Sequence, residues 1–424
     1  MTGANRHYVL AAGGTGGHLL PAFALAVELE RRGHHVALIT DERGAKIPGK
    51  PDFLPAHVLP AGRFGKNPLR WVSGIRAMLR GRDMAKRLFE TFQPSAVVGF
   101  GGYPAFPAMW AATGEDIPTV IHEQNAVLGR VNRFFARKVN AIATAYPDIQ
   151  RLDAKHKRKV HLVGNPVRKG VLSLRDEPFP PFTEDGLLKI LITGGSQGAR
   201  ILSEVMPPAL SMLPPALRQR LQVTQQCRPE DLERVREQYA SHDIPAELAT
   251  YFEEMAPRLA DAHLFIGRAG ASTIAELTAV GRPAILIPLP IATDDHQAHN
   301  TAEMVKAGGA RMIRQPKVTL KDPDEFGETR GNAIRRQQEA VLQQLSKDIS
   351  KQIQAMAQRP ETLETAAHGA WNCGRPRAVE DLADLVESFG GAEMMDVIKV
   401  GGNNARAASQ GVAAGQGAAR ERSQ

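Results

Sequence analysis

Two glycine-rich turns, far apart in the chain, constrain its fold more than any other feature. The first, GGTGGH, spans residues 13–18, and the second, GGSQGAR, spans residues 194–200. Each turn follows a short apolar run, at residues 8–12 and 188–193, and precedes an amphipathic stretch. A strand, a glycine turn and a helix in this order bring backbone amides to a helix N-terminus, which favours phosphates. Two copies predict two nucleotide-binding folds that face each other across a cleft.

Strand-like and helix-like segments alternate along both halves of the chain. This alternation predicts an α/β protein with two Rossmann-like, doubly wound domains. A proline-rich linker at residues 173–186 is expected to divide an N-terminal domain, residues 1–172, from a C-terminal domain, residues 187–390. A polar, Gln- and Arg-rich insertion is expected near residues 321–345, and residues 391–424 are expected to be a disordered tail.

Composition narrows the class of partner. The formal net charge of +8 favours an anionic partner: a phosphorylated substrate, an anionic lipid or nucleic acid. Nucleic acid is the least favoured, because aromatic residues make up only 5% and no RNA-type stacking motif is present. The two cysteines, Cys227 and Cys373, argue against a disulfide framework or a zinc knuckle and fit a reducing cytoplasm. The uncharged run at residues 91–114 is broken by glycines and prolines, which argues against a transmembrane helix.

The first glycine turn ends in a histidine. His18 stands at a helix N-terminus, where the dipole disfavours imidazolium and keeps the ring available as a base. We therefore predict that His18 is a general base, while a histidine that only caps or packs the turn is the alternative. The Rossmann dinucleotide fingerprint is incomplete, since Leu19 stands where its third glycine belongs. Gly14, Gly16 and Asp41 nevertheless leave an NAD-dependent oxidoreductase as a rival interpretation.

The second turn is the stronger phosphate signal. Its amides are expected to form an anion nest, with a serine hydroxyl as an added donor. The residues of this predicted nest are Gly195, Ser196, Gln197 and Gly198. Arg168, in the GNPVR run, can reach a diphosphate with two parallel hydrogen bonds. A ligand-free structural turn and an ordinary surface arginine are the alternatives.

Three further polar runs follow strand-like segments. In RAGASTIAEL, Glu276 lies about one turn into a helix, where a carboxylate can accept both hydroxyls of a ribose or simply favour the helix dipole. In DDHQAHN, Gln297 and Asn300 suit sugar hydroxyls, and no complete set of metal ligands is evident. HEQN, which ends at Asn125, either supplies polar groups to the cleft or caps a loop.

A basic amphipathic segment lies within residues 65–82. Tryptophan and aliphatic side chains alternate there with arginines, which suits an anionic membrane surface. A half-buried helix explains the same pattern equally well, because apolar stripes usually face protein cores. The predicted membrane patch consists of Leu69, Arg70, Trp71, Ile75, Arg76 and Arg80.

Six of these runs, together with GFGGYP at residues 99–104, resemble in their order along the chain the MurG family of UDP-N-acetylglucosamine–lipid I N-acetylglucosaminyltransferases, glycosyltransferase family 28. They are GGTGGH, GFGGYP, HEQN, GNPVR, GGSQGAR, RAGASTIAEL and DDHQAHN. The resemblance implies a GT-B fold, with the donor nucleotide mostly on the second domain and the acceptor on the first. It implies inverting transfer of N-acetylglucosamine from UDP-N-acetylglucosamine to the 4-hydroxyl of the N-acetylmuramoyl group of lipid I. The product, lipid II, serves peptidoglycan synthesis and hence cell shape and division.

The resemblance also assigns residues to the site. Arg168 and Ser196 match contacts to the donor diphosphate, and Glu276 matches the ribose contact. The backbone of Phe252 matches a contact to the uracil edge, and His18 matches a proposed general base. The full set implied to bind UDP-N-acetylglucosamine is Thr15, Gly16, Gly17, Asn125, Arg168, Ser196, Phe252, Glu276, Gln297 and Asn300.

Partners and location follow from the same resemblance. It implies a peripheral protein on the cytoplasmic face of the bacterial inner membrane, in contact with anionic lipid, lipid I and other cell-wall synthesis proteins. No cofactor is expected, because backbone amides and Arg168 can stabilise the leaving diphosphate without a metal. Besides the oxidoreductase, two alternatives stay open: the same fold with another acceptor, and a non-catalytic nucleotide-sugar sensor.

Overall fold

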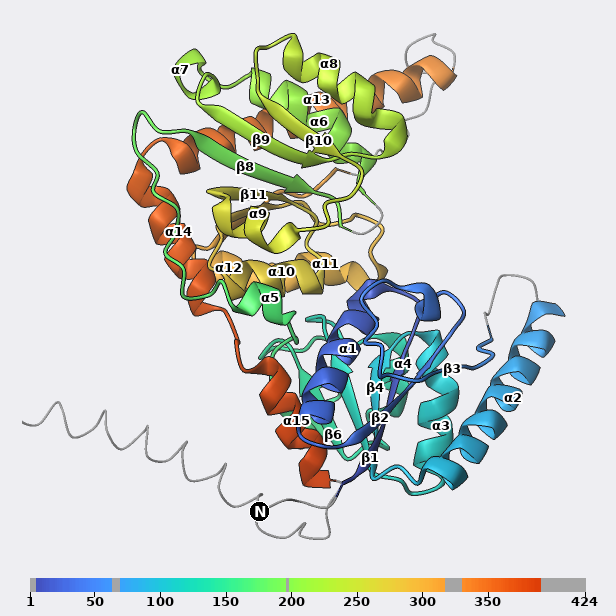
Figure 1. The fold of residues 1–424 in the computed structure, drawn as a ribbon. Helices are drawn as coiled ribbons and strands as arrows, with labels where there is room; N and C mark the ends of the chain where they lie inside the picture. Colours follow the sequence, from blue (N-terminus) through green and yellow to red (C-terminus); the bar gives the residue numbers. More distant parts are fainter. Residues whose placement is uncertain (1–4, 63–68, 196–197, 317–329, 390–424) are drawn as a thin grey trace, which may run out of the picture.

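The computed structural model describes residues 5–62, 69–195, 198–316 and 330–389. Two parallel sheets form the centres of two domains, stacked one above the other in Figure 1. The first sheet has the strand order β3-β2-β1-β4-β5-β6-β7 and the second has the order β10-β9-β8-β11-β12-β13. This arrangement confirms the predicted α/β fold with two Rossmann-like domains.

The first sheet is covered by helices on both faces. Its strands are β1 (His7–Ala12), β2 (His35–Thr40), β3 (Ala56–Val58), β4 (Ala96–Gly101), β5 (Thr119–Glu123), β6 (Ala141–Thr144) and β7 (Val160–Leu162). Its main helices are α1 (Gly16–Arg31), α2 (Leu69–Phe92), α3 (Phe106–Gly114) and α4 (Arg130–Phe135). Successive side chains of a strand point to opposite faces. Tyr8 and Leu10 of β1 accordingly join the core under α1, while Val9 and Ala11 join the core under α3.

The second domain repeats the scheme. Its strands are β8 (Leu188–Thr193), β9 (Leu221–Gln226), β10 (Ala246–Ala249), β11 (Leu264–Gly267), β12 (Ala284–Leu286) and β13 (Ala310–Met312). Its longer helices are α6 (Arg200–Ser211), α8 (Leu232–Ala240), α9 (Met255–Asp261), α10 (Ala271–Ala279), α13 (Arg330–Ala357) and α14 (Pro360–Asn372). Shorter helices are α5 (Lys169–Leu172), α11 (His296–Asn300) and α12 (Ala302–Lys306).

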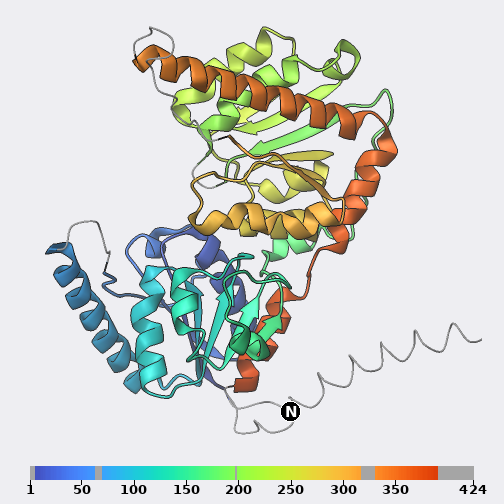
Figure 2. The same ribbon diagram turned by 180° about the vertical axis from the view of Figure 1, so that it is seen from behind.

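The predicted insertion near residues 321–345 falls partly on α13. Residues 321–329 lie outside the described part of the chain. The side chains at 335, 336 and 338–340 are exposed, as expected for a polar insertion. From Leu345 onward the helix is anchored, because Leu345, Ile349 and Ile353 are fully buried against α6. Figure 2 shows α13 lying along the second domain. The predicted tail, residues 391–424, also lies outside the described residues.

The chain crosses between the domains at different points from those predicted. Val163 belongs to the core of the first domain, while Val167 and Val171 belong to that of the second, so α5 is part of the second domain. The predicted boundary at residue 172 is therefore several residues late. Residues 173–187 connect α5 to β8.

A second crossing returns the chain to the first domain. The last described helix, α15 (Ala378–Phe389), packs against α1, and Leu382 and Val386 are fully buried in the first core (Figure 1). Arg32 donates to Asp384 and Glu387 of this helix. The prediction that the C-terminal domain continues to residue 390 is therefore wrong. An apolar helix stripe does not identify the sheet that it covers, so the sequence pattern could not assign α15 to a domain.

Candidate active site

The first glycine turn lies between β1 and α1, at the end of the first sheet that faces the second domain (Figure 1). Gly14 has a φ of +63°, and a Cβ on Gly13 would lie only 2.3 Å from Pro104 of the GFGGYP run. These two glycines are thus required by backbone conformation and by close packing. Thr15 and Gly17 are exposed at the turn, and Gly16 is half-buried.

His18 is held by this turn. Its Nδ1 lies 3.1 Å from the carbonyl oxygen of Gly13 and 3.1 Å from Thr15 Oγ1. Because a carbonyl only accepts, the contact with Gly13 requires a proton on Nδ1 and leaves Nε2 with its lone pair. An added Cβ on Gly101 would lie 3.5 Å from Nε2, so this nitrogen faces the end of β4.

The surroundings of His18 favour the neutral ring. Burial lowers the pKa of His18, and the Glu123 carboxylate and the Gly13 hydrogen bond oppose this only partly. His296, on α11 of the second domain, lowers the pKa further. A neutral imidazole with a free Nε2 can accept a proton from a hydroxyl group. His18 as general base stays a prediction, and the geometry is compatible with it.

Most of HEQN serves the first domain itself. His122 is fully buried with Nε2 2.9 Å from the Gly164 carbonyl, and burial lowers the pKa of His122 to about 4. Glu123 accepts hydrogen bonds from the backbone amides of Asn125, at 3.1 Å, and Gly129, at 2.8 Å. Loop capping therefore accounts for Glu123, while Asn125 extends toward the other domain.

Asn125 and Asn300 meet across the domain boundary. Asn300 Nδ2 donates to Asn125 Oδ1 at 3.1 Å, and Asn300 Oδ1 accepts from the Ala126 amide at 2.8 Å. Asn300 is fully buried in this arrangement. Nearby on α11, Gln297 Oε1 accepts from the Leu289 amide at 2.9 Å. The structure thus brings these three predicted sugar contacts to one place, with their amides bonded to protein.

Arg168 and Glu276 also come together. Arg168 donates through Nη2 and Nε to Glu276 Oε1, at 2.8 and 3.2 Å. Burial raises the pKa of Glu276, and the Arg168 guanidinium opposes that rise. The predicted diphosphate contact and the predicted ribose contact are therefore partners here. A nucleotide that used both would have to separate them.

The second glycine turn precedes α6. Gly195 and Gly198 have φ values of +80° and +64°, and the Gly198 amide donates to the Gly195 carbonyl at 2.9 Å. A Cβ on Gly194 would lie 2.2 Å from the Ala199 nitrogen, so the turn depends on its glycines. Ser196 and Gln197 lie outside the described residues, and the nest stays a prediction.

Phe252 follows β10 in the second domain. Its ring is buried, and the Arg258 guanidinium lies over it at 4.6 Å. The side chain is thus occupied by packing, which leaves only the backbone for the predicted uracil contact. That contact stays a prediction.

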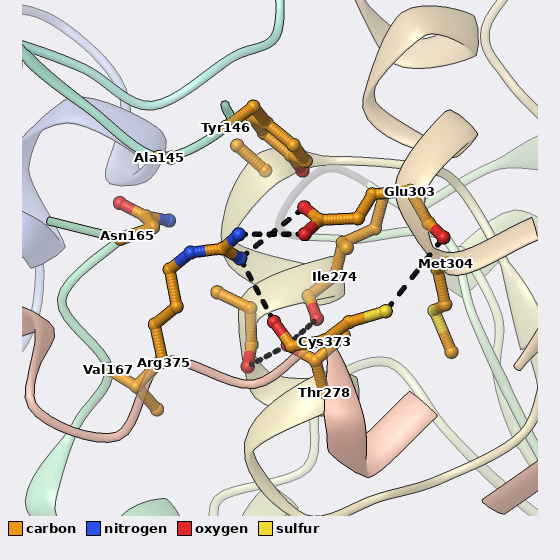
Figure 3. A pocket seen from close by; sticks show the side chains of 13 residues that line it. Ala145, Tyr146, Asn165, Val167, Ile274, Thr278, Glu303, Met304, Cys373 and Arg375 are labelled. Carbon is orange, nitrogen blue, oxygen red and sulfur yellow. Dashed lines mark hydrogen bonds and ion pairs between the residues drawn. The ribbon is translucent and has the colours of Figure 1, made fainter. Parts of the chain in front are cut away.

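Sequence reasoning missed a polar pocket between the domains, shown in Figure 3. Arg375 donates to Glu303 Oε1 at 2.7 Å and to the Cys373 carbonyl at 3.0 Å. Burial raises the pKa of Tyr146, which lines the same pocket. The buried amide of Asn165 has no hydrogen-bond partner among the described residues. The pocket lies where both crossing segments meet, and its lining includes residues of the GNPVR and RAGASTIAEL runs.

A metal site finds no support in the described residues. No group of three or more His, Cys, Asp or Glu side chains in this part of the chain is placed to hold a metal ion. The same part of the chain has no helix that is both long and apolar enough to cross a membrane. The Asp294 and Asp295 carboxylates of DDHQAHN are instead paired with arginines.

Comparison with known proteins first gives the class. The model of the glycosyltransferase family 28 N-terminal domain matches residues 8–144, and that of the C-terminal domain matches residues 189–326. The two sheets and the polar groups between them thus define a two-domain glycosyltransferase with the GT-B fold. A crystal structure of Acinetobacter baumannii MurG is similar, with a TM-score of 0.67 and 27% identity, covering 90% of this chain and 99% of that one.

Curated relatives narrow the class further. A UDP-N-acetylglucosamine–N-acetylmuramyl-(pentapeptide) pyrophosphoryl-undecaprenol N-acetylglucosamine transferase from Erythrobacter litoralis (strain HTCC2594) is 78% identical over 424 residues, which is 100% of both chains. A protein of the same name from Novosphingobium aromaticivorans is 68% identical over 410 residues, 97% of this chain and 99% of that one. This chain belongs to the family of these N-acetylglucosamine transferases.

Proposed function

We propose that this protein transfers N-acetylglucosamine from UDP-N-acetylglucosamine to lipid I and so forms lipid II. One observation carries the proposal: polar groups of the two domains meet, since Asn300 donates to Asn125 and His296 acts on the pKa of His18. The chain is 78% identical to a full-length relative of that name. The oxidoreductase interpretation leaves the second glycine turn and the paired Arg168 and Glu276 unexplained.

The donor belongs on the second domain. Gly195 and Gly198 take positive φ values in the turn that precedes α6, and Arg168 adds a guanidinium. Negative charge grows on the diphosphate as UDP leaves, and donors fixed in advance stabilise it without reorganisation. In this proposal Glu276 accepts the ribose hydroxyls once Arg168 turns to the diphosphate.

His18 supplies the base on the acceptor side. Its Nε2 takes the proton of the attacking 4-hydroxyl, whose oxygen bonds to the anomeric carbon. The bond from that carbon to the diphosphate oxygen breaks, and UDP leaves with the electron pair. One displacement of this kind inverts the anomeric centre and needs neither a covalent intermediate nor a bound metal.

The membrane side of the proposal rests on α2. Ile75, Arg76 and Arg80 are exposed on this helix, which lies on the outer side of the first domain (Figure 2). Leu69, Arg70 and Trp71 lie outside the residues whose side chains the structure describes. An apolar and cationic helix face suits the cytoplasmic surface of an inner membrane. In this proposal the protein encounters lipid I and other cell-wall synthesis proteins at that surface.

The test is transfer of labelled N-acetylglucosamine to a short-chain lipid I analogue, with and without EDTA. A β-1,4-linked product in both reactions supports the donor, the acceptor and the absence of a metal requirement. Release of UDP with a different acceptor alone would remove lipid I from the proposal. Stabilisation by NAD but not by UDP-N-acetylglucosamine would favour the oxidoreductase, since a ligand raises the stability of the state it binds.

A further inference from the structure

The loop that joins β12 to α11 reaches from the second domain to the first. Asp294 in this loop accepts a hydrogen bond from Arg133 Nη2 at 2.8 Å, and its other carboxylate oxygen lies 3.2 Å from Arg151 Nη2. Arg133 lies on α4, whereas Arg151 follows β6. Two separate segments of the first domain therefore converge on one carboxylate of the second, whose side chain is only 19% exposed.

The backbone on both sides of this contact is unusual. Asp294, Asp295 and Arg151 have φ values of +54°, +54° and +63°. Residues with a Cβ rarely adopt this left-handed conformation, which persists only where surrounding contacts hold it. Asp294 and Arg151 are held by each other, and Asp295 accepts from Arg314 Nη1 at 2.9 Å within the second domain. In this loop the Asp294 carboxylate therefore pairs with the first domain, whereas the Asp295 carboxylate pairs with its own domain.

The Asp294 contacts lie just before α11, and a second contact with the first domain lies at the other end of this helix. Asn300, the last residue of α11, binds the Ala126 amide of the first domain. Gln297 lies between these two contacts with the first domain. A five-residue helix fixed to the first domain at both ends cannot rotate far against it. Alignment matters here, because a misplacement of about 1 Å can lower a rate roughly 100-fold.

We propose that Asp294 is a positioning residue, which with Arg133 and Arg151 forms an interdomain clamp. The clamp fixes the register between α11 and the first domain, and hence between the donor sugar and His18. This inference rests on the proposed function, since it takes Gln297 as a contact to the donor sugar. The clamp touches neither Glu276 nor the second glycine turn, so it acts on alignment and not on donor affinity.

Asp294→Asn tests the clamp, because it removes the charge and keeps the shape. The expected result is a fall in kcat of roughly 10-fold with the donor KM changed by less than about 2-fold, the pattern of an interaction needed for the chemical step. Asp295→Asn is the matched control, since its carboxylate pairs with Arg314 of its own domain. We expect that control to keep kcat within about 2-fold of wild type. An unchanged kcat in the first variant, or an equal loss in the control, would overturn the proposal.

A mutant cycle tests whether the three residues act together. Arg133→Gln with Arg151→Gln should lower kcat about as much as Asp294→Asn, and the triple variant should lose little more. Independent, additive losses would contradict a clamp.

A distance measurement separates this inference from the proposed function, because it needs no turnover. Dyes placed by bioorthogonal chemistry at exposed Glu90 and Glu233 report the separation of the domains by Förster transfer. With UDP bound, Asp294→Asn should broaden that separation relative to wild type and to Asp295→Asn. An unchanged distribution would overturn the clamp even if wild type transfers N-acetylglucosamine. A broadened one in a protein that transfers nothing would retain the clamp and reject the function.

Discussion

His18 illustrates how single contacts decide chemistry at the residue scale. His18→Ala should lower kcat by roughly 100-fold or more, as removal of a general base does, with the donor KM little changed. His242→Ala, at an exposed position of the second domain, is the control and should leave kcat unaltered. Turnover near the wild-type level in His18→Ala would remove His18 from the role of base.

The pH profile gives the same residue a second test. Burial lowers the pKa of His18 below its ordinary value of about 6.5, so the ring stays neutral and basic down to a lower pH than a free histidine would. The fall of kcat/KM at low pH, the acid limb of the profile, should therefore have its midpoint below about pH 6.5. It should disappear in His18→Ala. An acid limb at or above that pH would contradict the environment described for the ring.

Glu276 supports a prediction about affinity and not about chemistry. Glu276→Ala should raise the donor KM by roughly 10-fold, the usual cost of losing a hydrogen bond to a charged group, and change kcat by only a few-fold. Glu233→Ala, exposed on α8, is the control. If the donor KM does not move, the ribose belongs elsewhere and the pair with Arg168 is purely structural.

At the scale of one element, the question is whether α2 binds a membrane surface or is an ordinary half-buried helix. Neutralising Arg70, Arg76 and Arg80 to Gln should weaken binding to anionic liposomes by roughly 100-fold, at about 1 kcal/mol for each basic residue near the lipid. The difference should shrink as salt is added, because ions screen exposed charges. The control replaces Arg236, Lys347 and Lys351, which are exposed on the second domain. Equal loss in both variants, or no loss in either, would favour the half-buried helix.

Helices, strands and the turns between them were the part of this structure that the sequence predicted best. Local pattern suffices where a strand is apolar and a glycine turn follows it, as at β1 with Gly14 and at β8 with Gly195. The same reasoning placed Glu276 on a helix and Gln297 and Asn300 after a strand.

Local sequence pattern could not find the partners of these side chains, since Asn300 meets Asn125 across a separation of 175 residues. Arg133 and Arg151 escaped notice because an arginine on a short helix or in a loop carries no local signal of a distant aspartate.

At the scale of the whole molecule, the domains are joined by two crossings of the chain and not by one linker. The linker was predicted from proline content, which marks irregular backbone but not the side on which a neighbouring helix packs. The actual crossings follow Val163 and Cys373, beside the pocket in which Arg375 pairs with Glu303. Both ends of the first domain are therefore stabilised together, because α1 and α15 share one core.

This shared core gives a prediction that separates the observed domain boundary from the predicted one. Leu382 of α15 and Leu363 of α14 are both fully buried, yet Leu382 packs in the first core and Leu363 in the second. Each change to alanine should cost about 2–5 kcal/mol of unfolding free energy, as for other buried leucines. Hydrogen exchange resolves where that cost falls, since amides of a weakened core exchange faster. Leu382→Ala should accelerate exchange in β1 and spare β8, and Leu363→Ala, its matched control, should do the reverse. Faster exchange in β8 after Leu382→Ala would return α15 to the second domain.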